Sequence, residues 1–167
     1  MNLNNKDVRV IVLGTAQDGG FPQVGCKKKC CNGAWEDVTL KRKVSSLAII
    51  HGNDCWLIDI TPDFRQQFAL IEAEIGSLPN ISGIFITHAH VGHYMGLLDL
   101  GLEIMNTQSM PVHVMPKMSE FLQNNAPFTQ LIELNNIKLE LMSDGEDIQL
   151  NNHLSIMPFM VPHRNEF

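Results

Sequence analysis

Short apolar runs separated by polar, glycine-rich or proline-containing segments dominate the pattern of the chain. Runs of β-branched and aliphatic residues bounded by Gly, Asn, Asp or Pro are typical of buried strands. The predicted strands are Val8–Leu13, Ser45–Ile50, Cys55–Ile60, Ile81–Thr87, Val112–Met115, Leu131–Leu134, Ile137–Met142 and Leu154–Val161. The polar residues His51 to Asp54 between the second and third runs predict a hairpin turn.

Apolar residues recur at helical spacing in three other segments, which predicts helices over about Pro62–Glu74, Gly96–Met105 and Pro116–Gln123. Thr61 is the expected N-cap of the first helix, with a proline at its first position. The segment from Gly14 to Trp35 shows no clear period and is expected to be a long loop, a kind of segment that is usually functional or clamped. Strands alternating with helices predict a mixed α/β fold, with residues 1–167 forming a single domain.

Composition and charge indicate which classes of binding partner this protein is expected to lack. The net charge of −6 argues against a non-specific nucleic-acid binder, which normally carries a basic face. No apolar run approaches the roughly 20 residues needed to span a bilayer, so no membrane partner is expected. The N-terminal MNLNNKDVRV lacks the apolar core of a signal peptide, which predicts a cytoplasmic location, or a periplasmic one if a leader has been removed.

Three histidines lie within the six residues HAHVGH, from His88 to His93, directly after a predicted strand. Residues two apart in an extended segment point to the same side, so His88 and His90 could offer two nitrogens to one ion. His93 follows the turn at Gly92 and would approach from another direction, which suits a neighbouring position or a second ion. The alternative is three scattered surface or helix-capping histidines.

Three of the four cysteines, Cys26, Cys30 and Cys31, lie within the predicted loop beside Lys27 to Lys29. Thiolates near lysines ionise readily and bind zinc, so a structural zinc site is the leading interpretation, with free thiols and a disulfide as alternatives. The adjacent Cys30 and Cys31 are not expected to bridge each other, because that ring is strained. Cys55 is expected to be a small buried apolar residue.

The segment THAHVGHYMGLL, from Thr87 to Leu98, resembles the THxHxDHxxGL signature of the metallo-β-lactamase superfamily. LGTAQDGGFPQVGC (13–26) and LIDITPDFRQQF (57–68) resemble the branch that holds the pyrroloquinoline quinone biosynthesis protein B and the phosphonate-pathway cyclic phosphodiesterase. The resemblance implies an αββα sandwich with metals held by loops at one edge of two sheets. It also implies that this chain comprises the N-terminal half to two-thirds of such a domain.

Placed on the family motif, His88, His90 and His163 would hold a first metal ion and His93 would bind a second. Gly92 stands where the family normally has an aspartate that holds the second metal and orients the attacking water. Asp59 becomes a candidate acceptor for the N–H of a ligand histidine; alternatively it is a carboxylate at the entry of the following helix. In the phosphodiesterase relatives a similar cysteine loop holds a structural zinc.

The family's later bridging aspartate and final histidine have no counterpart before Phe167. The resemblance therefore implies an incomplete domain whose first sheet exposes an apolar face, which predicts a homodimer through that face. It also implies little or no catalytic activity for the 167-residue chain by itself.

For the intact protein, the resemblance implies a metal-dependent hydrolase that acts on a small-molecule phosphodiester or other ester through a metal-activated water. The expected cofactor is zinc, as one or two ions, with iron or manganese as alternatives at the histidines. One alternative function is an iron-dependent oxygenase-type enzyme like the quinone-biosynthesis relatives. Another is a non-catalytic metal-binding fragment.

Overall fold

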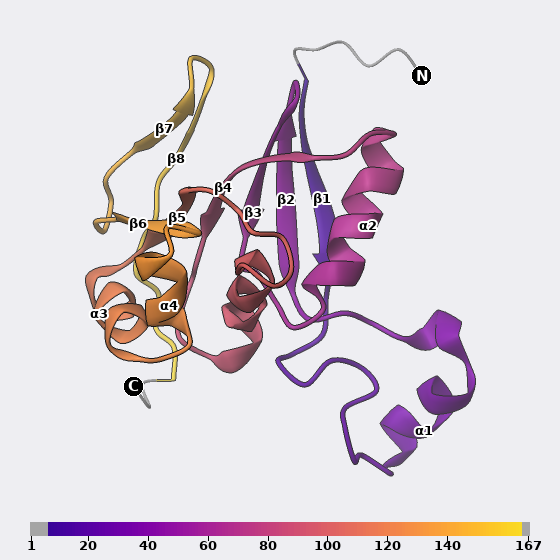
Figure 1. The fold of residues 1–167 in the computed structure, drawn as a ribbon. Coiled ribbons are helices and arrows are strands. Elements are labelled where there is room, and N and C mark those ends of the chain that lie inside the picture. The colour runs from indigo at the N-terminus through magenta and orange to yellow at the C-terminus, as the bar shows by residue number, and fades with distance from the viewer. Residues whose placement is uncertain (1–6, 165–167) are drawn as a thin grey trace.

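The computed structural model describes residues 7–164, and its largest element is a six-stranded sheet with the order β1-β2-β3-β4-β5-β6 (Figure 1). The strands are β1 (Val8–Gly14), β2 (Ser46–His51), β3 (Asp54–Ile58), β4 (Asn80–Phe85), β5 (Met110–Val114) and β6 (Ile137–Leu141). β1 to β3 pair antiparallel and β3 to β6 pair parallel. Residues 1–6, where a signal peptide would begin, and residues 165–167 at the chain end lie outside the described residues.

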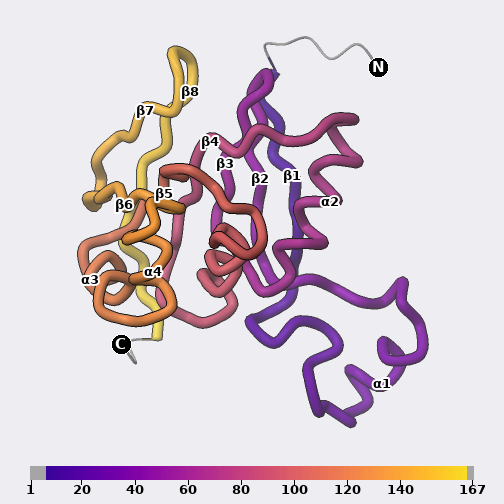
Figure 2. Tube along the Cα trace, viewed as in Figure 1, coloured from indigo at the N-terminus to yellow at the C-terminus, as the bar shows by residue number. Residues whose placement is uncertain are grey.

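The α-helices are α1 (Lys29–Glu36), α2 (Phe64–Ile75), α3 (Pro116–Asn124) and α4 (Phe128–Glu133), and the 3-10 helices are η1 (Val38–Leu40), η2 (Val91–His93) and η3 (Met95–Leu100). Helices α2, α3 and α4 and the 3-10 helix η3 cover one face of the sheet, whereas α1 lies apart from it (Figure 2). Because side chains alternate along a strand, Cys55 and Leu57 of β3 face the main core, whereas Trp56 faces the other side. Within residues 7–164, no helix has the length and apolar character required to cross a bilayer.

A second, smaller apolar cluster lies on the opposite face of the sheet. Trp56, Phe85 and Met142 form its buried centre. A hairpin of β7 (Ile148–Asn151) and β8 (Leu154–Ile156), drawn in yellow in Figure 1, packs its apolar residues against this cluster. The fold is therefore a mixed α/β arrangement, which confirms the predicted class.

Three segments end at one edge of the sheet. β1 is antiparallel to β2, β2 is antiparallel to β3, and β3 is parallel to β4, so β1, β3 and β4 all run in the same direction. The loops that follow their carboxyl ends consequently meet at a common edge, where open α/β sheets usually bind ligands. These loops begin after Gly14, Ile58 and Phe85.

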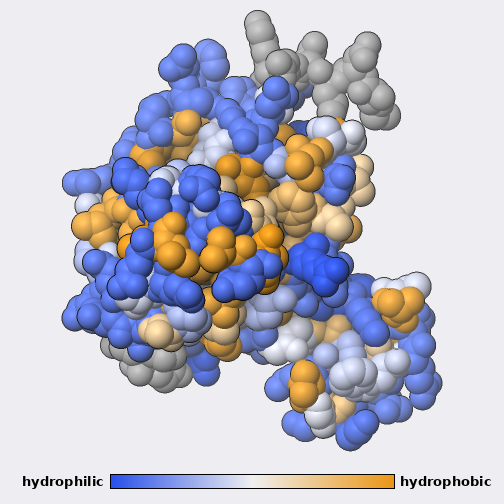
Figure 3. Space-filling view, viewed as in Figure 1, coloured by the Kyte–Doolittle hydropathy of each residue, from blue (hydrophilic) through white to orange (hydrophobic). Residues whose placement is uncertain are grey.

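Residues 22–41, here called the cysteine lobe, stand apart from the body of the molecule (Figures 1 and 3). Reciprocal backbone hydrogen bonds between Phe21 and Arg42, of 3.0 and 2.8 Å, close the base of the lobe. Within it, Cys31 and Ala34 of α1 are buried, whereas Val24 and Val38 are 85% and 71% exposed. The lobe therefore has little apolar core of its own.

The structure differs from the predicted elements in several places. Leu131–Leu134 is wrong as a strand: Phe128 and Leu131 are one helical turn apart in α4 and both enter the core. The helix expected over Gly96–Met105 is reduced to η3 (Met95–Leu100), and the predicted loop at 14–35 contains most of α1. The last predicted strand ends at Ile156, two residues before Pro158, which has no N–H for a ladder.

Candidate metal centre

The structure brings His88, His90 and His163 together. His88 and His90 follow β4, and His163 lies in the segment after β8. Their candidate ligand nitrogens all lie within 4.8 Å of one another, and His163 Nε2 is 3.1 Å from His90 Nδ1. We call this set the three-histidine centre. Residues 73 positions apart in the chain thus meet at one point.

Asp59 anchors the loops around this centre. It is 5% exposed at the end of β3 and adopts φ 64°, a left-handed conformation that aspartate tolerates better than most residues. Its carboxylate accepts hydrogen bonds from the Thr87 N–H at 2.8 Å and from the Thr87 hydroxyl at 2.8 to 2.9 Å. The same carboxylate lies 2.6 Å from His93 Nδ1. Asp59 therefore ties the ends of β3 and β4 together.

These hydrogen bonds decide which nitrogens carry protons. The Thr87 hydroxyl donates its hydrogen to Asp59, so its oxygen must accept from His88 Nδ1, 2.9 Å away. A carboxylate only accepts, so His93 Nδ1 donates to Asp59. In the neutral state both rings consequently keep a lone pair on Nε2. Hydrogen bonds of this kind, from the ring nitrogen that does not bind the ion, orient histidines that bind metals.

The local electrostatics favour a neutral His88. Burial lowers the pKa of His88 to about 4, and the nearby His93 acts in the same direction. Burial also opposes a charge on His93, but the hydrogen bond and negative charge of Asp59, together with Asp18, leave the pKa of His93 raised. His88 is therefore unprotonated at neutral pH, the state in which imidazole binds a metal ion.

Two further side chains complete the edge, and the sequence analysis did not assign them a role. Asp18, in the loop after β1, places Oδ1 3.3 Å from His93 Nε2. Arg164 places Nη2 3.2 Å from His90 Nε2. No local sequence signal marks Asp18, because its contact with His93 depends on β1 and β4 running in the same direction, so that the loops after them share an edge. The signal for Arg164 was its position next to His163.

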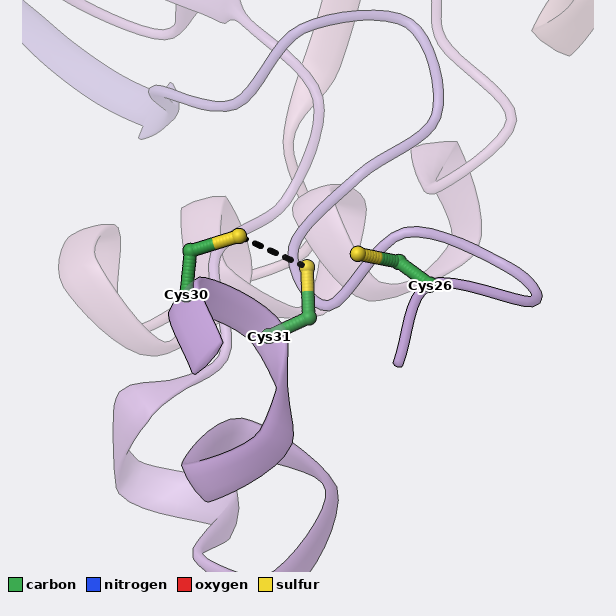
Figure 4. Close-up of side chains that lie close together, drawn as sticks. All are labelled: Cys26, Cys30 and Cys31. Atoms are coloured by element: carbon green, nitrogen blue, oxygen red, sulfur yellow. Dashed lines mark hydrogen bonds between the residues drawn. The ribbon is translucent and has the colours of Figure 1, made fainter. Parts of the chain in front are cut away.

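The three cysteines of the cysteine lobe also converge (Figure 4). Their sulfur atoms lie within 4.8 Å of one another, and the Cys30 and Cys31 sulfurs are 3.9 Å apart, far beyond a disulfide bond. Cys26 comes from the preceding loop, whereas Cys30 and Cys31 lie in the first turn of α1. A hydrogen bond from the Cys31 thiol lowers the pKa of Cys26, and a Lys28 backbone contact adds to this.

The other histidines and the fourth cysteine lie in ordinary surroundings. Cys55 is 1% exposed in the main core, which confirms the expected buried residue, and burial raises its pKa to about 12. His51 lies 2.8 Å from Asn151 in the hairpin, and His113 stacks on Phe85. Among residues 7–164, only the cysteine cluster and the three-histidine centre bring together three potential metal ligands.

The chemistry of the donor sets fits metal ions. Three imidazoles, with His88 held neutral and oriented, match sites that bind zinc or iron and leave a further coordination position open. Three thiols match the soft donors of a structural zinc site, which takes four ligands. The predicted cysteine ligands therefore lie close together, and so do His88, His90 and His163. The fourth predicted histidine ligand, His93, instead contacts Asp18 and Asp59.

Comparison with known families gives one matching model. Residues 56–167 match the family described as the Beta-lactamase superfamily domain. This range contains the HAHVGH segment, Asp59 and His163, and it begins at Trp56 in β3.

Individual relatives and solved structures point to the predicted branch. Coenzyme PQQ synthesis protein B of Rhodopseudomonas palustris is 39% identical over 99 residues, which cover 56% of this chain and 32% of the relative. Zn²⁺-bound PqqB from Methylobacterium extorquens aligns with a TM-score of 0.78 and 28% identity, covering 92% of this chain and 56% of that one. A diphosphatase from the PhnP family aligns with a TM-score of 0.65 and 26% identity, covering 86% and 53%.

Proposed function

Because the chain belongs to the β-lactamase superfamily domain family, we propose that it forms the metal-binding part of a metal-dependent hydrolase. The convergence of His88, His90 and His163 at the sheet edge is the observation that carries this proposal. The chain spans about half the length of the related PqqB structure. We therefore assign the activity to the protein that contains this domain, and expect metal binding from the 167-residue chain itself.

Some residues at this edge of the sheet would bind the ion, and others orient the residues that bind it. His88, His90 and His163 would bind the ion, and Asp59 and Thr87 keep His88 oriented with Nε2 available. Zinc in such a site supplies Lewis acidity and lowers the pKa of a coordinated water to about 7. A substrate of this chemistry would be an ester whose reacting group lies beside the ion held by the three histidines.

Arg164 favours a phosphodiester over a neutral ester. Its guanidinium lies 3.2 Å from a nitrogen of His90, so a bound cation would add a second positive charge at this place. An anionic substrate compensates these charges, and the planar guanidinium matches two phosphate oxygens. One of the structural neighbours is described as a diphosphatase from the PhnP family.

Metal analysis of paired variants tests the proposal. We expect His88→Ala to bind about one equivalent of zinc less than the wild type, because it removes one of three nitrogen ligands. His153→Ala is the matched control, since His153 is an exposed histidine on the hairpin. Hydrolysis of bis(p-nitrophenyl) phosphate should depend on added zinc in a protein containing the complete domain. Unchanged zinc stoichiometry in His88→Ala contradicts the ligand assignment.

A role in coenzyme PQQ synthesis is the second candidate. The sequence and structural similarity to PqqB supports it. Gly92 also stands where the family motif has a carboxylate. Under this function the three-histidine centre would hold iron and activate oxygen. Iron content with oxygen consumption therefore favours the PQQ role, and zinc with phosphodiester hydrolysis favours the hydrolase. Metal bound only at the cysteines indicates a non-catalytic module.

For the cysteine lobe we propose a structural zinc held by Cys26, Cys30 and Cys31. The grouping of three sulfurs and the lowered pKa of Cys26 support it. A fourth ligand would come from water or from a further side chain.

A further inference from the structure

We propose that Asp18 replaces, from a different loop, the carboxylate that Gly92 lacks, and that Asp18 and His93 hold a second metal ion beside the three-histidine centre. This inference extends the proposed metal-dependent function, on which it rests. It adds a ligand from the loop after β1 to a site otherwise built from the loops after β3 and β4 and from the segment after β8.

Asp18 fills the space that a side chain at position 92 would need. A Cβ atom added to Gly92 would lie 2.6 Å from both Cα and Oδ1 of Asp18, and 2.9 Å from its Cβ. Such distances are too short for any non-bonded contact between carbon atoms. A carboxylate at position 92 and the observed place of Asp18 therefore exclude each other. The glycine is what allows the Asp18 loop to approach.

The distance from Asp18 to His93 fits two ligands of one ion. Ligands about 2.0 to 2.2 Å from a zinc ion, at angles between octahedral and tetrahedral, lie about 2.8 to 3.6 Å from each other. Oδ1 of Asp18 and Nε2 of His93 are 3.3 Å apart. By contrast, the hydrogen bond on the other side of the same ring, to Asp59, is 2.6 Å long. The contact with Asp18 is thus long for a charge-assisted hydrogen bond.

The lone pairs at this place are also available to a metal ion. The Nδ1 proton of His93 points to Asp59, so in the neutral ring the Nε2 lone pair faces the Asp18 carboxylate. Two acceptors at this distance repel each other unless a proton or a metal ion lies between them. The His93 ring is centred 4.0 Å from the His88 ring, so an ion held here would be a close neighbour of one held by His88.

Cobalt titration of the 167-residue chain tests the assignment, with EPR detecting magnetic coupling between neighbouring ions. The wild type should bind two ions at the histidines and show coupling. We expect Asp18→Asn to bind one equivalent at least about tenfold more weakly and to lose the coupling. Asparagine retains the shape and can still hydrogen-bond His93, so a purely positioning role would leave binding unchanged. His93→Ala should have the same effect as Asp18→Asn, and the double variant should not be weaker than either single variant.

Further variants separate this inference from the proposed function. Asp147→Asn, an exposed aspartate outside the site, is the matched control and should bind like the wild type. Gly92→Ala should displace the Asp18 loop and weaken binding of the same cobalt ion. Circular dichroism should show that each variant is folded. Wild-type affinity and coupling in Asp18→Asn overturn the second site while leaving His88→Ala to test the first. Loss of one ion in Asp18→Asn, with none lost in His88→Ala, supports the second site and contradicts the three-histidine ligand assignment.

Discussion

The two clusters of potential metal ligands are built in opposite ways. The histidines lie at the ends of strands of a well-packed sheet, and buried Asp59 fixes Thr87 and His93 through three donor groups. The cysteines lie in the cysteine lobe, which has little core and is closed at its base by the Phe21–Arg42 pair. One site is held by the fold around it, whereas the other has few contacts that would keep it in place.

This difference indicates how metal binding is coupled to folding in each region. A helix of eight residues, such as α1, is marginal in water without tertiary support. Binding of an ion by Cys26, Cys30 and Cys31 would supply that support, as in small metal-stabilised domains. The histidine centre should keep its geometry without metal, because its hydrogen bonds are made within the protein.

The largest expected effect is the loss of Asp59. Asp59→Ala would leave the N–H and hydroxyl of Thr87 and the Nδ1–H of His93 without their acceptor at a partly buried place. We expect the free energy of unfolding of the metal-free chain to fall by about 2 to 4 kcal/mol, measured by urea denaturation. Zinc binding at the histidines should fall with it.

A carboxylate of the cysteine lobe provides the control. Asp37 also accepts hydrogen bonds from a backbone N–H and a hydroxyl, both of Thr39, but it is exposed. Asp37→Ala should therefore leave the unfolding transition of the main body close to that of the wild type. Equal destabilisation by the two substitutions would contradict the view that only the histidine site is fixed by the folded sheet.

A smaller effect is expected when metal is removed from the cysteine lobe. At pH 8 in the presence of zinc, Cys26, Cys30 and Cys31 should resist alkylation, and a chelator should make them reactive. Cys55 should stay unmodified in both states, because burial raises its pKa to about 12 and leaves only about 10⁻⁴ of it as thiolate. Mass spectrometry of peptides measures each cysteine separately.

The result also distinguishes the alternatives for the thiols. Rapid labelling of all three cysteines despite bound zinc would show that they are free thiols. His88→Ala should retain the protection, since the cysteines and the histidines bind independently under our proposal.

Local signals in the sequence were sufficient for part of this site. His88 and His90 are two residues apart after a strand, so their shared direction follows from strand geometry. His163 was assigned through the family motif, because nothing local to it indicates a contact with His90, 73 residues away. The segment Leu131–Leu134 was misassigned since a short apolar run fits a strand or a helix, and packing of Phe128 and Leu131 decided for α4.

Asp18 shows why the remainder could not be predicted. Sequence comparison with the motif revealed that Gly92 lacks a carboxylate, but it contained no indication that another loop supplies one. That contact depends on the shared direction of β1 and β4 and on the missing Cβ of Gly92, because a Cβ at that position would lie only 2.6 Å from Asp18. The glycine at position 92 and the carboxylate of Asp18 lie in different loops, and only the folded sheet brings these loops together.

The smallest effect concerns protons at the histidine edge. Burial, followed by the charge of His93, lowers the pKa of His88 to about 4. An unfolded chain would protonate this histidine already below about pH 6.5, so its contribution to stability is complete above that pH and is lost as the pH falls toward 4. The effect is modest because the ring is partly exposed. The cysteine lobe has no corresponding buried histidine among its residues.

An NMR titration of the metal-free chain would measure the pKa of each histidine ring separately. The His88 ring should titrate with a midpoint near pH 4, whereas His93, whose pKa is raised by Asp59 and Asp18 against its own burial, should titrate above the ordinary value of about 6.5. Because the ring centroids are 4.0 Å apart, His93→Gln should raise the pKa of His88 by removing a neighbouring charge. A midpoint for His88 near 6.5 in the wild type would mean that water reaches this edge freely. The fold would then not preorganise the three-histidine centre, and the contrast with the cysteine lobe would disappear.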